Sequence, residues 1–224
     1  QADNVTVNGF TFDMAGLTPA WTITASNKPG GGRFNAVQVL YNHFQGNPAT
    51  AAQSDPGGAY LAKQDNVLIE GNFFDALGSH GVYLAQSSTN AVYRQNDSVG
   101  NYLANLSTHD LPHTNLLAES NRADSDAMLL HGLRDATVQN NSFKGSASGA
   151  SRIYLGGGNQ RVVVKGNVFQ SLRSEAIRAA DDGLGYGAND TLTLTQNSVT
   201  TPVTLLAATA AMIDLRGVAG TTSV

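Results

Sequence analysis

Three side chains that can exchange protons stand at matching places before short apolar segments of the chain. His80, Tyr102 and Asp126 each precede the first apolar residue of such a segment by two positions. If the segments stack as neighbouring strands, the imidazole, the phenol and the carboxylate lie about 5–10 Å apart. Groups of this kind can take a proton from carbon and return one to a leaving oxygen. The alternative is that these side chains lie in turns and form hydrogen bonds with the backbone.

Basic residues lie near this set in the sequence and can balance a negative charge on a substrate. A cation beside the reacting carbon stabilises the charge that develops when the proton leaves. The predicted catalytic residues are therefore His80, Tyr102, Asp126 and Arg152, with Arg122 and Lys144 predicted to bind the substrate.

Three tyrosines, Tyr60, Tyr83 and Tyr154, each stand between two apolar residues. In a strand with one buried face, such a middle residue points outward. A row of tyrosines on an outer face can bind sugar rings, because each offers an apolar ring face and a hydroxyl. Two alternatives are a loop that covers them, such as residues 45–57 or 144–151, and a protein–protein interface.

The segment 107–113 contains His109, Asp110 and His113, and His80 and His131 flank it in the sequence. These residue types can form a metal site or an acid–base pair. Their spacing matches no recognised ligand pattern, so the alternative is a polar loop between strands.

A repeat of 20–30 residues supplies the elements that would position these side chains. Its form is apolar-x-apolar-x-x-Asn-x-apolar, and its copies begin at Val5, Val37, Val67, Val92, Leu116, Ala136, Val162 and Leu192. The sixth position is Asn in six copies, Asp97 in one and Phe10 in one. The apolar alternation indicates a strand with one buried face. Asn tolerates the left-handed backbone of a sharp bend, and stacked asparagines can form a ladder of amide hydrogen bonds.

A second short strand follows each bend, and no helical stretch intervenes. A constant bend in every copy favours parallel stacking over an antiparallel meander, which does not need it. We therefore predict an all-β fold, a right-handed parallel β-helix solenoid of about eight coils with an Asn ladder, in a single domain over residues 1–224.

The composition excludes several classes of function. The 224 residues include 13 Lys and Arg against 17 Asp and Glu, without a basic cluster, which argues against nucleic acid as a partner. The absence of cysteine excludes disulfides and thiolate chemistry. No apolar run is long enough for a transmembrane helix.

Runs such as Val67–Phe74 followed by Gly81–Leu84 resemble the repeats of the pectin-lyase-like superfamily of right-handed parallel β-helices. The resemblance covers about residues 4–215. It implies an exported protein, outside the cell or on its surface, that acts on polysaccharides as a lyase, hydrolase, epimerase or tailspike. It also implies calcium as a candidate cofactor, for which Asp124 and Asp126, with Asp181 and Asp182, offer hard oxygen ligands.

The chain departs from the enzymes of that superfamily, because it is short and has no amphipathic helix before the first coil. We expect a lyase or an epimerase acting on an acidic polysaccharide, in which the acid–base set works on C5 of a uronic acid. The alternative is a non-catalytic structural or binding solenoid: a surface fibre, adhesin, tailspike segment or filament subunit that associates end to end.

Overall fold

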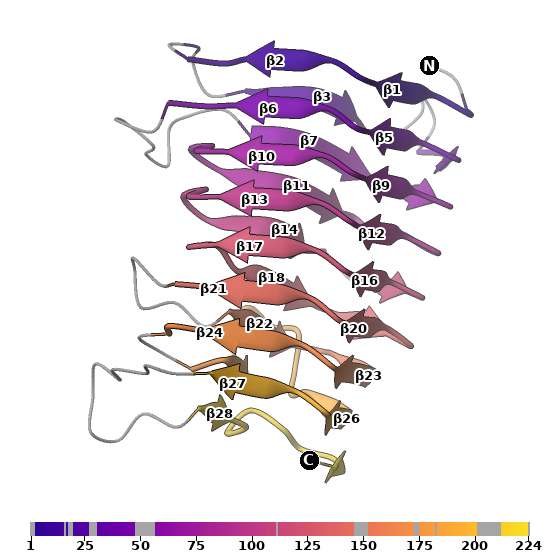
Figure 1. Cartoon of the computed structure of the whole chain (residues 1–224). Coiled ribbons are helices and arrows are strands. Elements are labelled where there is room, and N and C mark those ends of the chain that lie inside the picture. Colours follow the sequence, from indigo (N-terminus) through magenta and orange to yellow (C-terminus); the bar gives the residue numbers. More distant parts are fainter. Residues whose placement is uncertain are drawn as a thin grey trace.

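The chain winds around one axis as a stack of short strands (Figure 1). The computed structural model describes residues 3–15, 17, 20–26, 31–47, 57–110, 112–145, 152–172, 175–181, 183–200 and 212–223. These residues form parallel strands and no helix. No described element is a helix that could span a membrane. The predicted all-β parallel solenoid is confirmed.

Three long sheets run along the axis. The first contains β1 (Thr6–Asn8), β5 (Gln38–Leu40), β9 (Leu68–Glu70), β12 (Val92–Arg94), β16 (Leu117–Glu119), β20 (Thr137–Gln139), β23 (Gln160–Lys165), β26 (Asp190–Thr195) and β29 (Thr222–Ser223), with β15 (His113–Thr114) and β19 (Leu133–Arg134) joined through β23. The second contains β2 (Thr11–Asp13), β6 (His43–Gln45), β10 (Phe73–Asp75), β13 (Asp97–Val99), β17 (Arg122–Asp124), β21 (Ser142–Lys144), β24 (Val168–Gln170) and β27 (Ser198–Thr200).

The third sheet carries the candidate functional site. It contains β3 (Trp21–Ala25), β7 (Gly57–Ala62), β11 (His80–Ala85), β14 (Ala104–Thr108), β18 (Met128–His131), β22 (Ile153–Gly157), β25 (Ile177–Ala179) and β28 (Ile213–Asp214). A separate pair joins β4 (Phe34–Asn35) to β8 (Gln64–Asp65). Of the eight strands in this third sheet, the two at its edges have a neighbour on one side only. About six full turns are thus enclosed, fewer than the eight predicted from the repeats.

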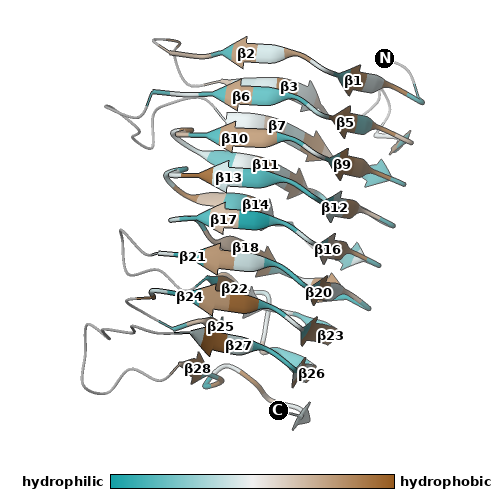
Figure 2. Ribbon diagram, viewed as in Figure 1, coloured by the Kyte–Doolittle hydropathy of each residue, from teal (hydrophilic) through white to brown (hydrophobic). Residues whose placement is uncertain are grey.

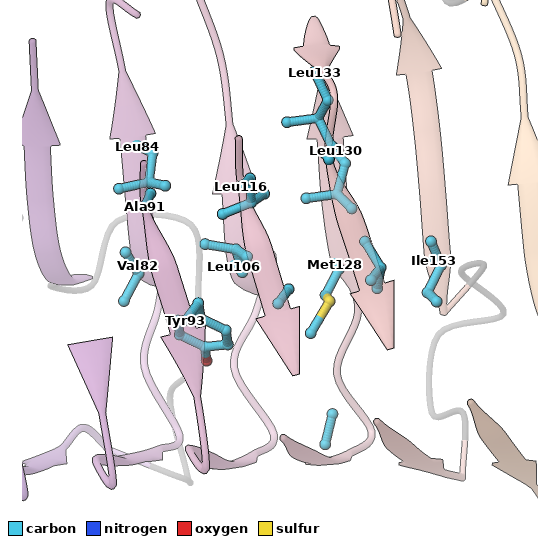
Figure 3. Packing of buried hydrophobic residues seen from close by; sticks show 14 of the residues in the cluster. Val82, Leu84, Ala91, Tyr93, Leu106, Leu116, Met128, Leu130, Leu133 and Ile153 are labelled. Carbon is cyan, nitrogen blue, oxygen red and sulfur yellow. The ribbon is translucent and has the colours of Figure 1, made fainter. Parts of the chain in front are cut away.

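The core fills the inside of the coils because alternate residues of each strand point inward. Val67 and Ile69 of one repeat are buried, as the pattern predicts. Phenylalanines stack between coils, with ring centres 5.0 Å apart for Phe44 and Phe74. Figure 3 shows side chains of successive coils, among them Val82 and Leu106, packed into this interior. Figure 2 shows both apolar and polar residues in the strands, as expected when alternate residues face the core and the outside.

The predicted Asn ladder is present along the bend between the first and second sheets. It consists of Asn42, Asn72, Asn96, Asn121, Asn141, Asn167 and Asn197. The side-chain amide of each of the first six donates to the carbonyl oxygen of the next asparagine, as from Asn121 to Asn141 at 2.8 Å. Each also donates to a backbone carbonyl, as from Asn121 to Tyr93 at 3.0 Å. The ladder therefore satisfies buried backbone groups that the bend leaves without a strand partner.

Two details of the predicted repeat are wrong. In the fourth coil the ladder residue is Asn96 and not Asp97, because Val92 pairs with Leu68 and Tyr93 points into the core. The left-handed backbone also falls one residue before the ladder asparagine, for example at Gln95 with φ 55°. The asparagine therefore contributes its side-chain amide to the ladder, and the residue before it adopts the left-handed backbone conformation of the bend.

Candidate functional site

The outer face of the third sheet carries a row of side chains in register. Tyr60 pairs with Tyr83, Tyr83 pairs with Ser107, and Leu129 pairs with Tyr154. The three predicted outward tyrosines therefore lie in one column, since Ser107 and Leu129 connect them. All three tyrosines are half-buried.

Aromatic rings extend this column into a continuous strip. We define the aromatic strip as Trp21, Tyr60, His80, Tyr83, His109, His131, Tyr154 and Tyr186. Its ring centres follow one another at short range: Tyr60 to Tyr83 at 5.7 Å, Tyr83 to His109 at 5.9 Å, His109 to His131 at 5.1 Å and His131 to Tyr154 at 6.0 Å. Rings in contact from five successive coils form one surface, which is unusual for a solvent-facing sheet.

The strip begins with Trp21, whose indole lies over the next strand. Trp21 pairs in register with Gly57, and a Cβ on Gly57 would stand 2.4 Å from a ring carbon of the indole. Only glycine leaves room for the ring there. The indole in turn contacts the rings of Tyr60, Tyr83 and His80 at 5.6, 5.8 and 6.1 Å.

A tyrosine from a distant coil reaches the middle of the strip. Tyr186 follows β25 in the chain, yet its hydroxyl lies 2.7 Å from Nδ1 of His109. Its ring also contacts His131 at 5.5 Å. The Asp110 carboxylate stands 3.5 Å from the same His109 nitrogen. An imidazole, a phenol and a carboxylate therefore meet here, although not the three that the sequence indicated.

His80 belongs to the aromatic strip, and its predicted catalytic role stays a prediction. Its Nδ1 lies 3.1 Å from the Ser79 hydroxyl, and its ring stacks against Trp21. Burial, aided by the nearby His109, lowers the pKa of His80 to about 4. The imidazole is therefore uncharged at neutral pH.

Tyr102 does not stand beside His80, so the predicted column is wrong at that position. The strand partner of His80 is Ala104, because Leu106 and not Ala104 aligns with Val82. Tyr102 lies two residues before the strand, and 52% of it is exposed. A shift of two residues keeps the inward–outward alternation, so the sequence pattern gave no sign of it.

Asp126 and Arg152 lie inside the solenoid, where no polysaccharide can reach them. Both residues are buried, at 2% and 1% exposure. Asn101 donates to the Asp126 carboxylate at 2.9 Å, and the Arg152 guanidinium donates to the Asp126 backbone oxygen at 2.7 Å. Burial raises the pKa of Asp126 to about 7 and lowers that of Arg152 to about 10. Asp126 and Arg152 therefore belong to the core, whereas His80 lies on the outer aromatic strip.

The other predicted substrate-binding cations belong to the second sheet. Arg122 lies in β17 and pairs with Asp97 at 2.9 Å. Lys144 lies in β21, 4.0 Å from Asp124. Neither cation lies on the face that carries the tyrosines. Their side chains are largely exposed and neutralised by acidic neighbours.

Within the described ranges, no group of three or more acidic, histidine or cysteine side chains is arranged to hold a metal ion. Asp124 is half-exposed on the second sheet whereas Asp126 is buried, and Asp182 lies outside the described residues. The calcium site stays a prediction. His113 of the histidine-containing loop is buried, receives a hydrogen bond from the Ser88 amide and donates to the His109 carbonyl.

Two members of the strip, Trp21 and Tyr186, are not among the residues predicted from the sequence, and His109 and His131 are predicted only as part of a metal or acid–base cluster. The contact of His109 with Tyr83 depends on strand ends that the repeat does not define, and His131 is buried behind the rings of His109, Tyr154 and Tyr186. Tyr186 has no signal in the repeat, because it lies in an irregular segment.

Comparison with known proteins agrees with this architecture. Residues 31–213 match the family model for the right handed beta helix region. The chain belongs to the right-handed β-helix family. The handedness predicted for the solenoid is therefore confirmed. No curated protein matches the sequence of this β-helix protein.

Solved structures are similar to this β-helix protein at low sequence identity. The tailspike protein of E. coli bacteriophage HK620, in complex with a pentasaccharide, has a TM-score of 0.60 at 12% identity, over 91% of this chain and 46% of the tailspike. A DFA-IIIase variant from Arthrobacter chlorophenolicus has a TM-score of 0.45 at 15% identity, over 99% of this chain and 63% of that enzyme. The chain thus spans about half to two thirds of the length of these proteins. At these identities the similarity shows the fold alone.

Proposed function

We propose that this β-helix protein binds a polysaccharide along the aromatic strip, outside the cell or at a cell surface. The observation that carries the proposal is the unbroken row of ring contacts from Trp21 to Tyr154 on one outer face. The tailspike that shares the fold was solved in complex with a pentasaccharide, which supports a carbohydrate ligand.

The geometry of the strip suits an extended sugar chain. Successive strands of a parallel sheet are about 4.8 Å apart, a distance comparable to the length of one pyranose ring. A polysaccharide that runs along the solenoid axis can therefore place successive rings on successive coils. The half-buried rings of Trp21, Tyr60, His80, Tyr83 and Tyr154 can supply apolar faces for the C–H groups of a sugar, whereas His131 is buried beneath them. The hydroxyls of Tyr60 and Tyr83 can take part in hydrogen bonds at the edge.

Isothermal titration calorimetry with a panel of neutral and acidic polysaccharides tests this function. Tyr154→Ala should weaken binding about fivefold, because it removes one stacking surface worth about 1 kcal/mol. Tyr102→Ala is the matched control, since that tyrosine is exposed and lies outside the strip. Equal losses in both variants, or no binding of any polymer by the wild type, would contradict the proposal.

Catalysis of β-elimination or epimerisation on an acidic polysaccharide is the second candidate function. The hydrogen bond between Tyr186 and His109 favours it, because it places a base beside an acid on the strip. In elimination the base takes the C5 proton, the C4–O bond breaks as C4=C5 forms, and the acid protonates the leaving oxygen. In epimerisation the proton returns to C5 from the opposite face. The Arg178 guanidinium lies 5.7 Å from the Tyr154 ring centre and could neutralise a substrate carboxylate there.

Elimination is tested by following absorbance at about 235 nm while the protein is incubated with alginate or pectate, with and without calcium. Epimerisation is tested by NMR, which follows the incorporation of solvent deuterium at C5. Loss of either signal in Tyr186→Phe would support the candidate. Absence of both signals from the wild type would contradict this second candidate function, whereas the proposed polysaccharide binding would still stand. End-to-end self-association stays a prediction, for which electron microscopy of the same sample is the measurement.

A further inference from the structure

One end of the aromatic strip is a compact cluster of rings from three successive coils. Trp21 comes from β3, Tyr60 from β7, and His80 and Tyr83 from β11. The rings of Tyr60 and Tyr83 are nearly parallel, at 11°, and His80 meets Tyr83 edge-on at 5.1 Å. Trp21 contacts the other three rings. We call these four residues the ring platform.

The ring platform is built into the backbone of the sheet. Gly57 provides the space that the Trp21 indole occupies, so the ring lies along the sheet and not away from it. The four residues are half-buried, which holds the rings in place while leaving part of each accessible. A preorganised surface loses little conformational entropy when a ligand binds.

The ring platform carries no charge at neutral pH. His80 is held neutral by burial, and burial keeps the pKa of the Tyr83 phenol well above its ordinary value. No ion pair in the described part of the chain involves the four side chains. Two of the cations predicted to bind a sugar carboxylate lie away from the ring platform, because Arg152 is buried in the core and Arg122 belongs to the second sheet.

We infer that the ring platform binds uncharged pyranose units, so that this part of the protein selects a neutral polysaccharide segment. The inference rests on the proposed polysaccharide-binding function and names its ligand class. A neutral sugar gains contact between its C–H face and the rings without losing the hydration of a charge. A uronate here would place its carboxylate against the electron-rich faces of the rings, and within the described residues the printed cation–ring contact is that of Arg178 with Tyr154, outside the ring platform. The expected ligand therefore differs from the acidic polymer predicted from the sequence.

Trp21 reports on this interaction directly, because it is the single tryptophan of the chain. Its fluorescence would be followed during titration with neutral polymers (dextran, β-glucan, galactomannan, xyloglucan) and acidic ones (alginate, polygalacturonate). We expect at least one neutral polymer to change the emission, with a Kd that varies less than about twofold between low and high salt. Tyr83→Ala should weaken this binding at least tenfold, whereas Tyr102→Ala should leave it unchanged.

The outcomes separate this inference from the proposed function. Binding of acidic polymers alone, with an affinity that falls steeply with salt, overturns the neutral ligand and leaves polysaccharide binding standing. Calorimetry could instead show that Tyr154→Ala abolishes the binding of a neutral polymer while Tyr83→Ala leaves it unchanged. The ligand would then bind at the other end of the strip, and the inference would be overturned. No binding of any polymer overturns both.

Discussion

The hydroxyl of Tyr186 lies 2.7 Å from Nδ1 of His109, across three coils of the solenoid. Tyr186 stands in a segment whose glycines, Gly183, Gly185 and Gly187, all have positive φ and open space around their Cα atoms. The Gly158 amide, which donates to the Gly187 carbonyl at 2.8 Å, provides a second attachment. The tyrosine therefore connects this segment to the middle of the aromatic strip.

Replacing Tyr186 by Phe should loosen this segment without unfolding the coils. The variant keeps the ring contact with His131 but loses the hydrogen bond, worth about 1 kcal/mol. We expect faster amide hydrogen exchange over residues 183–187, measured by mass spectrometry, with a change in Tm of no more than about 4 °C. Unchanged exchange there would show that the ring alone holds the segment.

Asp126→Asn should stabilise the protein more at high pH than at low pH. The pKa of Asp126 is about 7 in the fold and about 3.9 when unfolded, so the folded state binds the proton more tightly. The stabilisation from this proton is complete below about pH 4 and is lost as the pH rises to 7. Asn removes the titration while it can still accept the hydrogen bond from Asn101.

Urea unfolding of the wild type and of Asp126→Asn at pH 5 and pH 8 measures this difference. The gain in unfolding free energy should be larger at pH 8. Asp97→Asn is the control, because Asp97 forms a surface ion pair with Arg122 and should matter by less than about 1 kcal/mol at either pH. An equal effect of Asp126→Asn at both pH values would mean that the carboxyl does not titrate between them.

His80→Phe should preserve polysaccharide binding, whereas a catalytic His80 could not be replaced in this way. The phenyl ring can keep the stacking contact with Trp21 that the imidazole makes. His80 has a pKa of about 4 in the fold, below its ordinary 6.5, so the neutral ring stabilises the fold above pH 6.5 and this stabilisation is lost as the pH falls to 4. Phe has no such loss.

Calorimetric titration and thermal unfolding check both parts of this prediction. The Kd of His80→Phe should stay within about threefold of the wild type, and the difference in Tm, variant minus wild type, should grow as the pH falls from 7 to 4. His80→Ala is the companion variant and should weaken binding, because it removes a ring. Equal binding by both variants would exclude His80 from the ring platform.

Gly57→Ala should displace the indole of Trp21 while the coils stay folded. The added Cβ would meet the ring 2.4 Å away, and the ring is the end of a side chain that can swing aside. We expect a shifted tryptophan emission, weaker sugar binding and a small change in Tm. Gly58→Ala is the contrast, because its Cβ would meet the Gly81 backbone oxygen at 2.3 Å and should destabilise the fold. Unchanged emission in Gly57→Ala would contradict the placement of the indole.

Asn121→Ala should destabilise the protein by about 3 kcal/mol, measured by urea unfolding. Its side chain donates to Tyr93 and Asn141 and accepts from Asn96, all inside the structure, so the substitution leaves buried backbone groups without partners. Asn197→Ala at the end of the ladder is the matched control and should cost less than half as much, because that rung is only part-buried. Equal costs would argue against a cooperative ladder.

Much of the fold follows from local patterns in the sequence. Alternating residues such as Val67 and Ile69 indicate buried strand faces, and the recurring asparagines indicate a bend that repeats in every coil. Both patterns hold because each depends on neighbouring residues and on burial alone. The outward position of Tyr60, Tyr83 and Tyr154 was predicted for the same reason.

The candidate site was predicted less well, because it depends on register between coils. A shift of two residues leaves the alternation intact, so the pattern allowed Tyr102 to stand where Ala104 stands. It also gave no sign that Arg152 turns into the core. The meeting of Tyr186 with His109 involves an irregular segment that crosses three coils, and no periodicity encodes it.

The sequence by itself determined the kind of solenoid, its inward and outward faces and the amide ladder, because these arise from residue periodicity and the hydrogen-bonding capacity of asparagine. Only the tertiary structure decided which rings meet, which charges are buried and which face is neutral. Those properties depend on strand register and on contacts between residues far apart in the chain, where a change of one or two positions moves a side chain to a different environment.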